Sequence, residues 1–136
     1  MSAVDIRARQ DVMGMDELQA EVIHVGTDVF GQASVSDFDE RMLRFGEEAI
    51  ELMQAGGISY GKFLQLGHHV YSRDAGEITQ EIGGVGVTLF GVADAGDYSL
   101  GELTAIEIAR VAGNKDKIRA KSALKPDHIF STRSLI

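Results

Sequence analysis

The chain of 136 residues is long enough for one domain of ordinary size. With 44% hydrophobic and 25% charged residues, its composition is typical of a folded globular protein and excludes disordered and membrane-embedded classes. The formal net charge of -8 argues against a general nucleic-acid binder, and the lack of any cysteine excludes disulfides, thiolate metal sites and cysteine nucleophiles.

Apolar residues recur at steps of three and four along much of the chain, which predicts amphipathic helices. The first is predicted to start at the capping-box pair Asp16 and Gln19 and to run for roughly 13 residues. A second is predicted to start at Ser36 and to end at the glycine pair 56–57. A third is predicted over residues 60–71.

The fourth predicted helix has a competing interpretation as a strand. It follows the capping pair Asp74 and Glu77, but its VGVTLFGV run is rich in strand-forming residues and it contains four glycines. We favour a helix because the three–four spacing extends over residues 78–92, longer than a usual strand, and we expect the glycines to allow close helix approach. A last helix is predicted after Ser99, with Glu102 completing its cap. The prediction is an all-α fold whose apolar stripes form the core.

Five glutamates gather on two of these predicted helices. They are Glu47, Glu48 and Glu51 on the second and Glu77 and Glu81 on the fourth. The first three span an arc of roughly 100° beside the apolar stripe. Like charges at such spacings repel, so a cluster near a helix seam favours a compensating cation. Carboxylates without thiolates select hard ions such as Mg²⁺ or Mn²⁺.

A purely structural interpretation of the acidic helix stays open at this stage. Its EEAIE segment can be an ordinary solvated face, with Arg44 pairing to Glu48 one turn later. The basic C-terminal part of the chain has the same ambiguity, because it can hold the outer oxygens of a phosphate-rich ligand or simply pair with the acidic body.

Four segments carry a resemblance to a known family. RMLRFGEEAIELMQAGG, QEIGGVGVTLFGVADAGDYSL, ELTAIEIARV and KIRAKSALKP resemble the all-α nucleoside triphosphate pyrophosphohydrolases of the MazG type, especially small phage dATP/dGTP pyrophosphohydrolases that accompany 2-aminoadenine DNA synthesis. The resemblance implies a single domain over residues 1–136, with 115–136 as a basic C-terminal segment. It also implies a four-to-five-helix bundle that works as a homo-oligomer, a dimer or tetramer with sites at chain interfaces.

The family's acidic motifs map onto this chain with one departure. Its Glu-x-x-Glu motif corresponds to Glu48 and Glu51, with Glu47 completing the extended form. Its Glu-x-x-Asp motif corresponds to Glu81 and Gly84, so the fourth carboxylate is missing, and Glu77 or Glu47 could reach its place. The resemblance thus implies two or three Mg²⁺ or Mn²⁺ ions held by the residues Glu47, Glu48, Glu51, Glu81 and Glu77.

The activity implied is cleavage of a purine nucleoside triphosphate, above all dGTP, to the monophosphate and pyrophosphate, which would supply dGMP for 2-aminoadenine nucleotide synthesis. Glu48 and Glu51 are the expected catalytic residues, and Glu48 is expected to accept the proton of the attacking water. The expected phosphate-binding residues are Lys115, Lys117, Arg119 and Lys121. The alternative, which Gly84 keeps open, is a non-catalytic helical module that binds nucleotides or only oligomerises.

Two features of the chain set the expected location. Its longest apolar stretch, residues 85–93, is far short of the roughly 20 residues of a spanning helix, and its first residues lack the apolar segment of a signal peptide. We expect a cytoplasmic protein, in the host cytoplasm if a phage encodes it, with no membrane and no nucleic acid among its partners.

Overall fold

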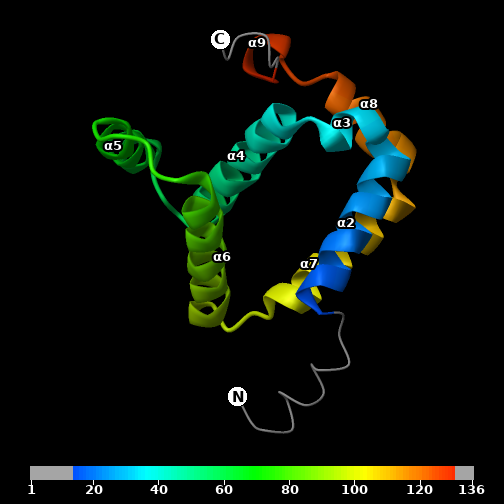
Figure 1. The fold of residues 1–136 in the computed structure, drawn as a ribbon, viewed down its shortest axis with the longest axis horizontal. Coiled ribbons are helices and arrows are strands. Elements are labelled where there is room, and N and C mark those ends of the chain that lie inside the picture. Colours follow the sequence, from blue (N-terminus) through cyan, green and yellow to red (C-terminus); the bar gives the residue numbers. More distant parts are fainter. Residues whose placement is uncertain (1–13, 131–136) are drawn as a thin grey trace, which may run out of the picture.

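The computed structural model describes residues 14–130, and every regular element in that part of the chain is a helix (Figure 1). The all-α prediction is confirmed for these residues, but the expected count of four to five helices is too low, and the helix after Ser99 is not the last because two short helices follow it. The start of the chain, on which the signal-peptide prediction depends, lies outside them. The helices are α2 (Met15–Phe30), α3 (Gln32–Ser36), α4 (Phe38–Ala55), α5 (Tyr60–Tyr71), α6 (Ile78–Ala95), α7 (Leu100–Gly113), α8 (Lys115–Ala123) and α9 (Asp127–Phe130).

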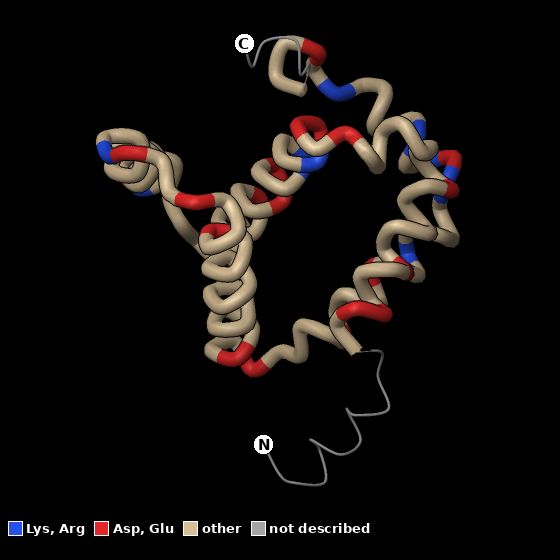
Figure 2. The backbone as a smooth tube through the Cα atoms, in the orientation of Figure 1, with Lys and Arg blue, Asp and Glu red and all other residues tan. Residues whose placement is uncertain are grey.

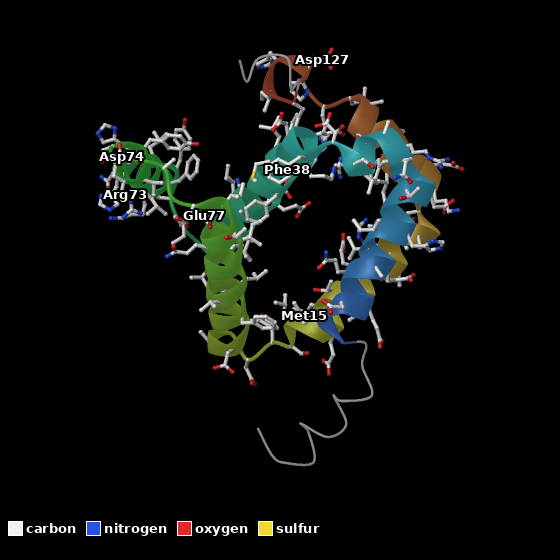
Figure 3. All side chains as sticks on the ribbon, in the orientation of Figure 1. Met15, Phe38, Arg73, Asp74, Glu77 and Asp127 are labelled. Atoms are coloured by element: carbon white, nitrogen blue, oxygen red, sulfur yellow. The ribbon has the colours of Figure 1, made fainter. Side chains whose placement is uncertain are left out.

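The segment with two interpretations forms α6, so the helix prediction is confirmed and the strand is excluded. Its capping pair was wrong in part, because Glu77 itself is the N-cap and accepts a hydrogen bond from the backbone N–H of Gln80 at 3.1 Å. Asp74 lies in the preceding loop beside Arg73 (Figure 3). Within residues 14–130, no helix combines the length and the hydropathy that crossing a membrane requires.

The other helix starts were predicted with mixed success. Ser99 caps α7 as expected, by accepting from the N–H of Glu102 at 3.3 Å. The predicted start of α4 at Ser36 was one residue early, because Asp37 has the extended backbone of a cap and accepts from Glu40 N–H at 3.0 Å. The capping box at Asp16 was also wrong: Gly14 precedes α2, and Asp16 lies in the first turn.

One side of the molecule is built around α2. This helix packs against α3, α7 and α8, and its buried side chains Leu18, Val25 and Val29 confirm the predicted stripe (Figure 1). Gly26 permits the close approach of α3, because a Cβ at this position would lie 3.3 Å from a methyl group of Val35. Three of the four buried apolar residues of the described chain lie here, and the fourth is Ala93 near the end of α6.

The other side consists of α4, α5 and α6, which do not pack along their lengths against one another within the described chain. The expectation that their apolar stripes form a core is wrong for a single chain. The glycines of α6 also have open space around them, so no other helix of the described chain approaches there. Large apolar side chains left exposed include Met42, Phe45, Ile82, Val85, Phe90 and Val92.

Candidate functional site

Three glutamates lie close together on α4, as the sequence predicts. Glu47 is half-buried, whereas Glu48 and Glu51 are exposed. Partial loss of hydration raises the pKa of Glu48 above its usual value, and repulsion from the carboxylates of Glu51 and Glu47 raises it further. A nearby cation would reduce the repulsion between Glu48 and its two neighbouring carboxylates.

A cation from the C-terminal segment already meets this cluster. The ammonium group of Lys125 forms an ion pair with both carboxylate oxygens of Glu47. The guanidinium of Arg44 lies 3.7 Å from the same carboxylate, so Arg44 contacts Glu47 rather than the predicted Glu48. The basic segment and the acidic helix are thus neighbours in the fold, although they are far apart in the sequence (Figure 2).

The two acidic residues at the start of α6 are engaged locally. Glu77 caps the helix and accepts a second hydrogen bond from the hydroxyl of Thr79, and these bonds lower the pKa of Glu77. The Glu81 carboxylate folds back over Gly76, and a Cβ at position 76 would require the Glu81 side chain to shift. Gly84, at the position where the resemblance leads one to expect an aspartate, has open space around it.

The structure does not bring the two acidic groups together in one chain. Across residues 14–130, no three carboxylate or imidazole groups converge closely enough to hold a metal ion. The physical reason is the separation of α4 and α6, which are joined through α5 and do not pack along their lengths. A joint site for Glu47, Glu48, Glu51, Glu77 and Glu81 stays a prediction.

Two of the four expected phosphate-binding residues hold α2 in place. Lys115 forms an ion pair with Asp28, which lowers the pKa of that carboxyl. Arg119 donates hydrogen bonds of 2.7 Å to the backbone carbonyls of Val29 and Asp28 in the last turn of α2. These carbonyls have no partner inside their own helix, so Arg119 satisfies them.

The other two, Lys117 and Lys121, are exposed on α8, with no side-chain partner among the described residues. Lys117 also lines a shallow cavity of about 400 Å³ at the junction of α7 and α8, together with Lys115. Lys117 and Lys121 can therefore bind an anionic ligand without the loss of an internal contact.

Two residues of this region escaped the sequence analysis. Lys125 lies at the end of the KIRAKSALKP segment but is not among the four expected phosphate-binding residues. Glu107 of α7 adds to the rise in the pKa of Glu48, which places α7 within electrostatic reach of the acidic helix. Glu107 is itself paired with Arg110 through two hydrogen bonds, one of 2.9 Å and one of 2.5 Å. The IEIAR segment offered a signal, because it contains an acid and a base one turn apart.

Comparisons with known proteins do not decide the identity of this site. No family model, no curated protein and no solved structure matches the chain. The family resemblance therefore remains a prediction from the sequence segments that carry it.

Proposed function

We propose that the protein is a metal-dependent nucleoside triphosphate pyrophosphohydrolase, with a purine nucleotide, above all dGTP, as its substrate. The observation that carries the proposal is the crowding of carboxylates around Glu48, whose pKa is raised, on a helix that the basic C-terminal segment contacts. Acidic and basic groups side by side suit a divalent cation and a polyphosphate, respectively. The products would be the nucleoside monophosphate and pyrophosphate, in the cytoplasm where such nucleotides are used.

The donor atoms of these glutamates are carboxylate oxygens, which Mg²⁺ and Mn²⁺ prefer, and the proposal needs more than one chain because no three such groups converge within residues 14–130. The repulsion that helps to raise the pKa of Glu48 is the kind that a bound cation removes. A bound ion would neutralise triphosphate charge and acidify a water molecule. The residues that would hold two or three ions are Glu47, Glu48 and Glu51 of α4, with Glu81 and Glu77 contributed by α6 of a second copy.

The chain's own groups have separate roles in this proposal. Glu48 accepts a proton from the water that attacks the α phosphorus, for which a raised pKa is suitable. The bond from the α phosphorus to the bridging oxygen breaks, and pyrophosphate leaves. Lys117 and Lys121 hold its oxygens, whereas Lys115 and Arg119 would first have to release α2.

A homo-oligomer is part of the proposal. A stable domain of this size buries roughly two thirds of its unfolded surface, yet Val87 is 73% and Ile82 59% exposed. Residues 82–93 of α6 contain no charged side chain, and their glycines offer room for a close helix. A second copy covering this apolar face would complete the core, and it would bring acidic residues of two chains together.

The test is a product assay with each deoxynucleoside triphosphate and Mn²⁺. We expect a monophosphate and pyrophosphate from the purine substrates, and a large loss of turnover in Glu51→Gln. Release of orthophosphate, or full turnover in Glu51→Gln, would contradict the proposal. Binding of dGTP with no turnover would instead favour the non-catalytic module, which the exposed apolar face of α6 also suits.

A further inference from the structure

Helix α5 carries an apolar stripe that no other helix of the described chain covers. The stripe consists of Phe63, Leu66 and Val70, of which Leu66 is 49% and Val70 43% exposed. α5 does not pack along its length against any other helix of residues 14–130 (Figure 1). Residues 60–73 also contain two histidines, a lysine and an arginine but no acid. α5 therefore combines an uncovered apolar face with cationic groups.

Helix α6 has the complementary properties. Its stripe has five members, all exposed except the half-buried Leu89; they are Ile78, Ile82, Val85, Leu89 and Val92. Residues 74–109, which include the whole of α6, contain no lysine, arginine or histidine, and Glu81 lies at the edge of the stripe. The two helices match in both respects, because each has an uncovered apolar stripe and their charges are opposite.

The charged groups lie on the same edge of the two stripes. His69 follows Leu66 by three residues and Glu81 follows Ile78 by three, so each is turned by about 60° in the same direction from its apolar neighbour. A two-fold rotation that places two such helices face to face in antiparallel orientation brings these edges together. Antiparallel packing also places Arg73, which follows the end of α5, near the acidic start of α6.

A second copy of the chain is the occupant that suits these faces. The whole chain exposes 10768 Å², whereas a folded monomer of this size is expected to expose about 7,000 Å². The difference exceeds the roughly 800 Å² that each partner buries in a standard interface. An anionic lipid surface is disfavoured, because it would repel the net charge of -8 and because Lys62 and Arg73 are the only permanent cations of residues 60–73.

We propose that α5 of one copy lies antiparallel on the apolar stripe of α6 of a second copy, with His69 beside Glu81, and that the reciprocal contact closes a two-fold dimer. This inference deepens the proposed function and rests on its homo-oligomer, because it names the element that covers α6. Each copy thereby supplies His69 and Arg73 to the start of the other copy's α6, which carries the expected site residues Glu77 and Glu81.

The first experiment uses the lack of cysteine in the chain. Leu66→Cys and Val85→Cys are made in separate chains, because these positions face each other when His69 lies beside Glu81. After the two variants are mixed and mildly oxidised, we expect a disulfide-linked heterodimer as the main cross-linked product. The control mixture pairs Gln65→Cys with Val85→Cys, and we expect several-fold less cross-linking because residue 65 lies on the polar side of α5.

A second measurement tests the charge pairing by sedimentation velocity at several concentrations. His69→Glu places two carboxylates together, so we expect the Kd of the dimer to rise by about fivefold, whereas His69→Lys is expected to lower it. Combining His69→Glu with Glu81→Lys in one chain is expected to restore the wild-type Kd. The matched control is His68→Glu, which makes the same change on the polar side of α5 and is expected to alter the Kd by less than about twofold.

The outcomes separate this inference from the proposed function. A wild type that dimerises without the cross-link, or an effect of His69→Glu no larger than that of His68→Glu, would mean that α5 does not cover α6, while the proposed homo-oligomer stands. A monomeric wild type would overturn both, whether the double variant Leu66→Cys/Val85→Cys closes a disulfide within one chain or the protein binds vesicles of phosphatidylserine and phosphatidylcholine instead. Turnover of dGTP is measured separately, so a failure of catalysis is distinguished from a failure of assembly.

Discussion

Lys125 contacts both carboxylate oxygens of Glu47, a residue 78 positions earlier in the chain. This ion pair joins the basic end of the protein to the helix that carries most of the expected metal ligands. The two partners belong to different parts of the fold, so substitutions can test the acidic helix and the basic C-terminal segment separately.

The first prediction concerns the proposed base. Glu48→Gln keeps the size of the side chain but cannot accept a proton at neutral pH, so we expect kcat for dGTP to fall by about 100- to 10,000-fold. Asp39→Asn is the matched control, because Asp39 is an exposed acid in the first turn of the same helix. Steady-state kinetics with Mn²⁺ decide the matter, and equal losses in the two variants would count against Glu48 as the base.

Glu48→Gln, which is expected to lower kcat, is expected to stabilise the fold at neutral pH. The pKa of Glu48 is raised above its usual 4.5 in the folded chain, so the fold favours the protonated form. Its contribution to stability is therefore present below pH 4.5 and is lost as the pH rises through the raised value. We expect Glu48→Gln to have a higher Tm than the wild type at about pH 7 and the same Tm at about pH 4. Thermal unfolding followed by circular dichroism measures both, and a shift of equal size at the two pH values would argue against this cause.

How far the sequence alone predicts the fold depends on the feature. The regular spacing of Ile78, Ile82 and Val85 correctly predicts the helix α6, because only a helix places those positions on one face. Periodicity cannot show what covers that face, which is why the exposure of Ile82 and Val85 was missed. Ser36 and Asp37 are both good capping residues, and only the backbone geometry decides between them.

The candidate site was predictable only within single helices. The positions of Glu47, Glu48 and Glu51 follow from helical spacing, and so does their mutual repulsion. The contact of Lys125 with Glu47 depends on how the chain's end returns to α4, and no local pattern contains that information. The contacts of Arg119 with the carbonyls of α2 were missed for the same reason.

Arg119 and Lys121 separate structural from ligand-binding roles on α8. Arg119→Ala removes two charged hydrogen bonds to the end of α2, so we expect it to lower the free energy of unfolding by about 1.5–3 kcal/mol. Lys121→Ala removes an exposed side chain and is expected to change that free energy by less than about 0.5 kcal/mol while raising KM for dGTP. Urea unfolding and kinetics of both variants provide the comparison. Equal stabilities would show that Arg119 does not hold α2.

Assembly provides a prediction that is independent of catalysis. Val87→Glu places a charge in the uncharged, exposed part of α6, so we expect it to shift the protein from a dimer or tetramer towards monomer and to lower its Tm. Gln19→Glu adds the same charge to an exposed position on α2 and serves as the control. Sedimentation velocity at several concentrations measures the outcome. A wild type that stays monomeric throughout would rule out the second copy as the partner of α6.

The position of the bond that is cleaved is the most direct test of the central proposal. Hydrolysis of dGTP with Mn²⁺ in water labelled with heavy oxygen, followed by mass spectrometry of the products, identifies the phosphorus that water attacks. We predict that the label appears in dGMP and that the pyrophosphate is unlabelled. Label in pyrophosphate, release of dGDP with orthophosphate, or no hydrolysis at all would contradict a pyrophosphohydrolase built on the α4 carboxylates.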